Sequence, residues 1–414
     1  MTSAINFPTQ PITFTASWND ANENFDETLL EKISRFFLGL INNIARASIL
    51  PASTNGEAHI QDVADNFKWK WTVEDQFLLL HNNFTPTPIE VTAPDGVKIR
   101  GTHFKNRAAQ ENSPTVICFQ ANGAISKQGV YDWMLNQAAI QEVPYNFVYF
   151  DYRGCGESEK IAARSAKDYY LDGESIYQFV RDKLHVPVSR IHFYGWSFGG
   201  GVSAKVKEVH PECDGNYVNE RSFSSVNDVI KNAIGMILAK IAGVFISFLN
   251  WNIQSAQAFD KIKGKSLIVH HPDDELMKNQ ASLYRSIFEK GTTVSSEIKE
   301  INLQRPSNPM EHIHGAPLAF FRTDSFNPEA EISQFLFSSN CTYNQRMVQI
   351  FRNSSLNFRT KVYETVARLY QNGGFYWGSA EDACNNRNGL FLTEEQLARA
   401  VTTAKLSTGG QPTV

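Results

Sequence analysis

Few cysteines occur in this 414-residue sequence, and their spacing matches no disulfide or metal-binding motif. The five are scattered and odd in number, and no CxxC motif occurs; they are Cys118, Cys155, Cys213, Cys341 and Cys384. Such a pattern argues against a disulfide framework and against a zinc knuckle, and it favours a reducing compartment.

Basic charge is not in excess either. Lysine and arginine number 39 against 43 acidic residues, and the formal net charge is -4 at pH 7. A nucleic-acid-binding surface needs a basic stripe or patch, so the composition predicts no nucleic acid partner. The first 20 residues contain no basic segment followed by an apolar run. We therefore expect no secretory signal peptide and a cytoplasmic protein, with non-classical export or peripheral membrane association as the alternatives.

Long uncharged apolar runs are missing as well. The most apolar stretch spans residues 229–251, but Lys231 and Lys240 interrupt it. A membrane-spanning helix needs about 18 or more consecutive apolar residues, so this stretch does not predict one. We expect a buried helix or an apolar cap over a site instead.

Residues 25–50 predict a strongly amphipathic helix near the N-terminus. Its apolar side chains recur at three- and four-residue spacing on one face, whereas its polar face mixes acidic, basic and amide side chains. We expect it to pack on the main domain as part of a helical N-terminal extension, residues 1–84. Contact with a membrane surface or with a partner protein is the alternative.

Residues from about 85 to 325 predict an α/β domain. Nearly continuous apolar strands are predicted at 115–123, 146–154, 190–197 and 266–274, with helices between them at 167–184 and 275–290. Continuous hydrophobicity indicates strands covered on both faces, and alternation with helices indicates a mostly parallel sheet wound by helices on both faces. Before these strands, residues 88–104 predict a hairpin that turns at Asp95-Gly96 and forms an antiparallel edge. Residues 326–414 predict a helical C-terminal extension.

The segment FYGWSFGGG, residues 193–201, combines a serine with flanking glycines. Ser197 lies between a predicted strand and a predicted helix, with Gly195 and Gly199 two positions to either side. This is the context of a nucleophile elbow, a strained turn that lifts the serine hydroxyl clear of the sheet and leaves no room for side chains at the two glycines. Free amides at the start of the following helix also favour developing negative charge. A glycine-rich packing turn is the alternative interpretation.

A nucleophilic serine needs a base, and the base needs an acid that orients it. In an elbow architecture both follow the serine in chain order, each after a strand. The predicted strand SLIVHH is followed by Asp273 and Asp274, of which one is expected to face the histidine. The later loop PMEHIHGAPL offers His312 and His314. We favour His314 because the Gly-Ala-Pro-Leu that follows it would leave its imidazole at a loop tip.

A metal site is a rival interpretation of the same segments. Imidazole and carboxylate ligands are available from His270, His271, Asp273, Asp274, His312 and His314. Their spacing matches no HExxH-type helix, however, and a metal site leaves the glycine-flanked serine unexplained. We therefore expect no metal and no other cofactor, and we expect His270 and His271 to be structural.

Acyl transfer also requires hydrogen-bond donors for an oxyanion. One is expected to be the backbone amide of Phe198, and the second an amide from the loop after an earlier strand. The segment CFQANGAIS, residues 118–126, supplies that loop, with Ala121 or Asn122 as the donor and Gly123 allowing close approach.

Several segments together resemble the α/β-hydrolase superfamily. They are FVYFDYRGCGESE, YLDGESIYQFV, GWSFGGGV, NERSFSSVNDVI and LIVHHPDDELM, in the order found in serine hydrolases described as α/β-hydrolase domain-containing proteins. The similarity covers about residues 85–325 and extends to hydrolases of intracellular bacterial pathogens. The resemblance implies the α/β-hydrolase fold and assigns the acid to Asp274. The sequence departs from it at Gln120-Ala121 and His270-His271, where many relatives have His-Gly.

These observations predict a metal-independent serine hydrolase that acts on a carboxylic ester or thioester through an acyl-enzyme. Ser197 is the expected nucleophile, His314 the base and Asp274 the orienting acid. The apolarity of residues 229–251 favours an acyl or lipid-like substrate. The alternative is a hydrolase-like scaffold without turnover that acts as a binding or interaction protein, which the unusual Gln120-Ala121 and the long extensions suggest.

Overall fold

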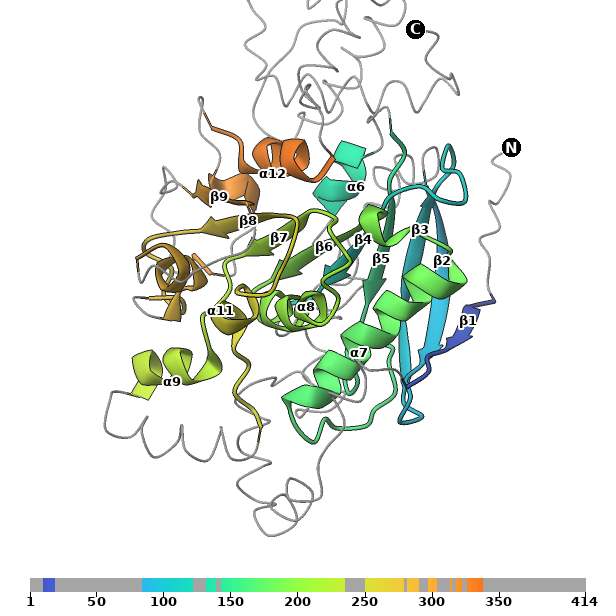
Figure 1. Cartoon of the computed structure of the whole chain (residues 1–414), viewed down its shortest axis with the longest axis horizontal. Coiled ribbons are helices and arrows are strands. Elements are labelled where there is room, and N and C mark those ends of the chain that lie inside the picture. The colour runs from blue at the N-terminus through green and yellow to red at the C-terminus, as the bar shows by residue number, and fades with distance from the viewer. Residues whose placement is uncertain are drawn as a thin grey trace, which may run out of the picture.

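A nine-stranded sheet forms the centre of the molecule (Figure 1). The computed structural model describes residues 10–18, 84–121, 132–138, 143–234, 250–278, 281–289, 297–303, 313–314, 318–321 and 326–337. Within these ranges the strand order is β1-β2-β3-β5-β4-β6-β7-β8-β9.

The parallel part of the sheet contains six strands. They are β4 (Thr115–Phe119), β5 (Asn146–Phe150), β6 (Ile191–Trp196), β7 (Tyr217–Glu220), β8 (Lys265–His270) and β9 (Glu297–Asn302). Every residue of β4, β5 and β7 is buried, as expected of strands covered on both faces. The mostly parallel sheet predicted from the sequence is confirmed.

A hairpin precedes these strands, and it lies where the sequence predicts it. β2 (Phe84–Thr92) pairs antiparallel with β3 (Lys98–Asn106), and the turn contains Gly96 at a φ of 90°, a conformation that favours glycine. The hairpin is not the outermost part of the sheet, because β1 (Ile12–Thr15) pairs in parallel with β2 on its outer side. This part of the segment predicted as a helical extension is therefore a strand of the sheet.

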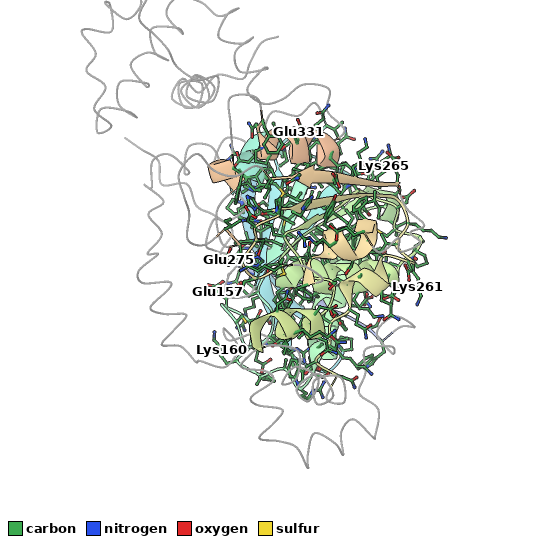
Figure 2. The ribbon with its side chains drawn as sticks, turned by 90° about the vertical axis from the view of Figure 1, so that its left-hand side faces the viewer. Glu157, Lys160, Lys261, Lys265, Glu275 and Glu331 are labelled. Atoms are coloured by element: carbon green, nitrogen blue, oxygen red, sulfur yellow. The ribbon has the colours of Figure 1, made fainter. Side chains whose placement is uncertain are left out.

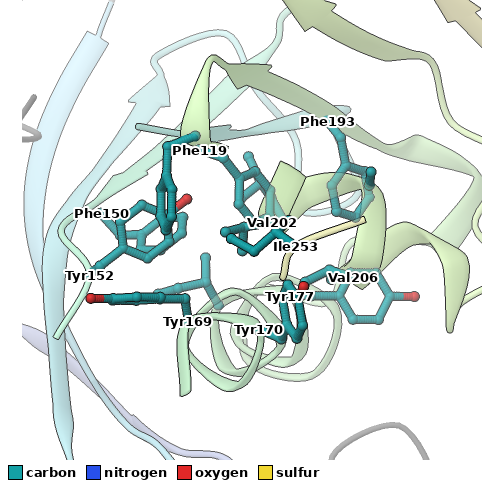
Figure 3. Packing of buried hydrophobic residues seen from close by; sticks show 14 of the residues in the cluster. Phe119, Phe150, Tyr152, Tyr169, Tyr170, Tyr177, Phe193, Val202, Val206 and Ile253 are labelled. Atoms are coloured by element: carbon teal, nitrogen blue, oxygen red, sulfur yellow. The ribbon is translucent and has the colours of Figure 1, made fainter. Parts of the chain in front are cut away.

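Helices cover both faces of the sheet (Figure 1). One face carries α7 (Ala166–Gln178), α8 (Phe198–Glu208) and α11 (Ser255–Ala258), and the other carries α6 (Asp132–Ala138) and α12 (Pro328–Phe337). Figure 3 shows the first of these cores, where Phe119 and Phe193 from neighbouring strands stack with ring centroids 5.6 Å apart over Val202 of α8. Burying one such phenylalanine stabilises the fold by about 1.5–3 kcal/mol.

Of the two helices predicted between the strands, the first forms over nearly its whole length and the second only in part. The first forms as α7 and continues into a π-helical turn at Phe179–Lys183. The second, predicted at 275–290, is helical mainly at Arg285–Glu289. The backbone amides of Leu276 and Met277 donate instead to the Asp274 carboxylate, at 3.0 and 2.9 Å, and such side-chain bonds compete with a helix.

The apolar segment after β7 begins with α9 (Val226–Ile234), whose Val226 and Val229 pack against the core. Its remaining part, 235–249, lies outside the described residues, as do the helix predicted at 25–50 and most of the C-terminal extension. In the ranges given above, no helix has both the length and the hydropathy to cross a membrane.

Candidate active site

Ser197 occupies a strained turn between β6 and α8. Its φ and ψ are 51° and -114°, which a residue other than glycine seldom adopts. Its amide donates to the carbonyl of Glu220 at 2.9 Å, and its carbonyl accepts from Ser222 Oγ at 2.8 Å. These two bonds to the end of β7 and the loop after it hold the turn in place, so the predicted strand-serine-helix geometry is present.

The glycines around the serine are required by close contacts. A Cβ on Gly195 would lie 2.7 Å from the carbonyl oxygen of Gly199, and one on Gly199 would lie 2.6 Å from the carbonyl oxygen of Gln120. A Cβ on Gly200 would lie 2.6 Å from that of Ser222. Neighbouring backbone leaves no room at the first two positions, which confirms the steric prediction made for them.

The three side chains predicted to act together lie in one hydrogen-bonded row. Ser197 Oγ is 2.7 Å from His314 Nε2, and His314 Nδ1 is 2.8 and 3.1 Å from the two carboxylate oxygens of Asp274. All three side chains are buried. An ionised carboxylate only accepts, so His314 carries its proton on Nδ1, and its Nε2 is left to accept from the serine hydroxyl.

Asp274 is held in its ionised form. Burial alone would raise the pKa of this carboxyl, but the hydrogen bond from His314 and those from the backbone amides of Met277 and Leu276 outweigh it, and the pKa lies below the ordinary value. The neighbouring Asp273 is exposed, and its amide donates to His271 Nδ1 at 3.0 Å. Of the two adjacent aspartates, the one whose carboxylate contacts His314 is Asp274, the residue that the family resemblance implied.

The other histidines near the strand end have structural surroundings. His270 is buried and stacks on Tyr284 with ring centroids 3.6 Å apart, and burial, with His271 and Arg285 nearby, lowers its pKa to about 4. His271 packs on Phe321 with centroids 5.5 Å apart. Among the described residues no group of three or more His, Cys, Asp or Glu could hold a metal ion, and His312 lies outside them.

The predicted oxyanion donors lie at the start of α8 and the end of β4. α8 begins at Phe198, and the first amides of a helix have no acceptor within it. The Phe198 ring packs edge-on against Tyr152 and Tyr169, at 5.4 and 5.2 Å. Ala121 is buried two residues after the end of β4, and the carbonyls of Phe119 and Gln120 approach Gly199. Asn122 and Gly123 lie outside the described residues.

Gln120, where the sequence departs from its relatives, is buried next to this donor. Only 1% of the residue is exposed, and neither its amide nitrogen nor its amide oxygen has a hydrogen-bond partner in the part of the chain that is described. Burying a carboxamide without hydrogen bonds lowers the stability of the fold. Packing alone therefore does not explain why a glutamine stands at this position.

Sequence reasoning missed two charged residues that contact the backbone of the His314 loop. The Glu275 carboxylate accepts from the amides of Ile313 and His314, and Arg221 Nη1 donates to the carbonyl of Ile313 at 2.9 Å. Both residues stand in segments that carry the family resemblance, PDDELM and NERSFSS. Both bind main-chain atoms, however, and hydrogen bonds to the main chain do not depend on the identity of the partner residue. The sequence therefore offers no pattern from which these contacts could be predicted.

Comparison with known proteins agrees with this architecture. Residues 114–217 match the family model of the alpha/beta hydrolase fold. The Alpha/beta hydrolase domain-containing protein WAV2 of Arabidopsis thaliana is 26% identical over 166 residues, which cover 40% of this chain and 48% of that protein. An uncharacterized protein of Acanthamoeba polyphaga mimivirus is 23% identical over 248 residues, covering 57% of this chain and 79% of its own length. The chain thus spans about half the length of the plant relative.

Solved structures with a similar chain path include two esterases. An esterase of Pyrococcus furiosus is 18% identical with a TM-score of 0.43, and the match covers 64% of this chain and 95% of that one. Acetyl xylan esterase 1 of a Thermoanaerobacterium species is 15% identical with a TM-score of 0.42, covering 57% and 83%. The sheet, the serine turn after β6 and the family match over residues 114–217 show that this chain has the α/β-hydrolase fold.

Proposed function

We propose that the protein is a serine hydrolase that cleaves a carboxylic ester or thioester through an acyl-enzyme. The observation that supports this most strongly is the row of hydrogen bonds from Ser197 through His314 to Asp274. Its donor and acceptor roles are those that activate a serine hydroxyl as a nucleophile.

The reaction would proceed in two halves. Ser197 Oγ attacks the acyl carbonyl while His314 Nε2 takes the hydroxyl proton, and Asp274 stabilises the imidazolium that forms. His314 then gives the proton to the leaving alcohol or thiol, and a water attacks the acyl-serine in the same way. The backbone amide of Phe198, with that of Ala121 or Asn122, would stabilise the oxyanion of each tetrahedral intermediate.

An acyl or lipid-like substrate is the preferred class. The support comes from the apolar segment that starts at α9, next to the elbow helix: a Cβ on Gly201 of α8 would touch Phe223 and Ile253, the residues that flank this segment. If this segment caps the site, as its apolarity predicts, it favours apolar acyl chains, because their burial is worth about 0.8 kcal/mol per methylene.

A panel of p-nitrophenyl esters of increasing acyl length tests the proposal. We expect the wild-type protein to hydrolyse them and the Ser197→Ala variant to have lost this activity with an unchanged melting temperature. Higher kcat/KM with longer acyl groups would support the lipid-like class. If the folded wild-type protein hydrolyses no ester or thioester, the binding scaffold suggested by Gln120-Ala121 becomes the better account.

A further inference from the structure

The peptide bond that joins Ile313 to His314 is held by charged side chains on both of its edges. On one edge, Arg221 Nη1 donates to the Ile313 carbonyl oxygen at 2.9 Å. On the other, the Glu275 carboxylate accepts from the His314 amide at 3.1 and 3.2 Å. The same carboxylate also accepts from the Ile313 amide at 2.9 Å. A cation thus meets the negative end of the peptide dipole, and an anion meets the positive end.

Arg221 is itself fixed in place. It is 3% exposed, forms an ion pair with Glu220, and lies over the rings of Trp196 and Phe321 at 5.4 and 5.3 Å. Tyr194 donates its hydroxyl proton to the other oxygen of the Glu220 carboxylate. A buried guanidinium with this many contacts has little freedom to move, so the carbonyl that it binds is held to the end of the sheet.

Glu275 follows Asp274 in the chain, and the two carboxylates bind different parts of the same histidine. Asp274 accepts from the imidazole, whereas Glu275 accepts from the main chain of that residue and of the one before it. Rotation of the Ile313–His314 peptide plane would break the bonds to Arg221 and Glu275 together. The Cα of His314 belongs to this peptide plane. The orientation of the plane therefore sets the position from which the imidazole side chain extends.

We propose that Glu275 is a positioning residue for His314, with Arg221 acting from the opposite edge of the same peptide. Glu275 fixes the main chain so that Nε2 stays within hydrogen-bond distance of Ser197 Oγ while Nδ1 stays on Asp274. The inference rests on the proposed serine hydrolase activity. A displacement of a reacting group by about 1 Å can cost on the order of 100-fold in rate, so a main-chain clamp of this kind acts on turnover.

Kinetics of two Glu275 variants test this role. Glu275→Ala removes all three hydrogen bonds, and we expect kcat to fall on the order of 10- to 100-fold with KM changed less than about threefold. Glu275→Gln can keep its oxygen at the Oε2 position, where it still accepts from the amides of Ile313 and His314, but it places an NH₂ group where Oε1 accepts from His314. Its loss should therefore be smaller. Asp273→Asn, an exposed carboxylate on the same loop, is the matched control and should keep wild-type kcat and KM.

A second readout does not depend on turnover. The proton on His314 Nδ1 should give a downfield imidazole resonance in the NMR spectrum of the wild-type protein, absent in His314→Ala. We expect this resonance to shift or broaden in Glu275→Gln and to be unchanged in Asp273→Asn. The Glu275→Gln variant retains the size of the side chain, so it serves if Glu275→Ala does not fold.

The outcomes separate the two proposals. A wild-type protein that shows the resonance but hydrolyses no ester or thioester would overturn the proposed function. The NMR comparison of the Glu275 and Asp273 variants would then decide the positioning role. Active Glu275→Ala with wild-type kcat, or a resonance that both Glu275 variants leave unmoved, would overturn the positioning role while the hydrolase proposal stands.

Discussion

Charged side chains serve different purposes at the two ends of the parallel strands. At the carboxyl ends, Asp274 binds the ring of His314, and Glu275 and Arg221 bind the backbone of residues 313 and 314. At the amino ends, His210 binds Glu174 at 2.6 Å and Glu212 at 3.0 Å, and the bond to Glu174 joins the loop after α8 to α7. Figure 2 shows how far apart these ends are, with Glu275 after β8 on one side of the molecule and Lys265 at the start of β8 on the other.

The amino-end network connects whole elements rather than a loop. Gln178 of α7 exchanges hydrogen bonds with the backbone of Ser17, just beyond β1, and also donates to Glu174. His210 stacks on Tyr177 with centroids 4.0 Å apart. None of these contacts reaches Ser197 or its partners. We therefore expect charged residues near the serine to affect turnover and charged residues at the opposite end to affect stability.

Ser197→Ala should produce the largest effect on turnover and none on stability. Loss of the nucleophile is expected to lower kcat/KM for a p-nitrophenyl ester by about 10⁴-fold or more. The substitution keeps the Cβ and removes only a hydroxyl, so the midpoint of urea unfolding should stay the same. A variant that retains activity would show that the carboxyl-end site is not where turnover occurs.

Asp274→Asn should follow, with a loss of about 10³- to 10⁴-fold. An amide in place of the carboxylate can donate to Nδ1 and stabilise the wrong tautomer of His314, so Nε2 would no longer accept the serine proton. Steady-state kinetics at pH 7 to 8 measures the change. Asp273→Asn made in parallel should be close to wild type, and equal losses in both would contradict the separation of the two aspartates.

Gly199→Ala should affect both properties, because the new Cβ meets the carbonyl groups of Phe119 and Gln120. We expect the free energy of unfolding to fall by about 1–3 kcal/mol and the activity of the folded protein to fall as well, since β4 and α8 must move apart. Urea unfolding and kinetics on the same preparation check this. Unchanged stability would mean that the elbow has more room than the structure gives it.

His210→Gln should have the smallest effect, and only on stability. Burial would lower the pKa of His210, but its hydrogen bonds to Glu174 and Glu212 outweigh this and raise it above 6.5. A raised pKa means that the protonated form stabilises the fold fully below about pH 6.5 and progressively less as pH rises through the folded-state pKa.

Urea unfolding at pH 6 and pH 9 measures that dependence. The variant should be less stable than wild type by about 1–2 kcal/mol at pH 6, with a smaller difference at pH 9 and unchanged kcat. A difference that grows toward pH 9 would contradict the sign of the linkage, and a lower kcat would break the division between the two ends.

Much of the parallel sheet and of the candidate site was predictable from the sequence, because both depend on local patterns. Continuous apolar runs predict β4, β5, β6 and β8, and the glycines around Ser197 follow from steric limits of the turn. β1 was not predictable in this way. It has four residues, ITFT, and its partner β2 is far away in the chain.

Other features depend on contacts that no spacing rule encodes. The helix predicted from 275 does not begin there, because Asp274 takes the amides that would start it. Arg221 and Glu275 were missed because they bind main-chain atoms of residues 313 and 314. His314 could be preferred over His312 from the sequence, but its hydrogen bond to Ser197 is a property of the fold.

Labelling with a fluorophosphonate probe, followed by mass spectrometry of the labelled peptide, tests most directly whether His314 activates Ser197. We expect the folded wild-type protein to be labelled at Ser197 and His314→Ala to react at least about 100-fold more slowly. Absence of labelling, labelling at another residue, or an equal rate in His314→Ala would rule out activation of Ser197 by His314.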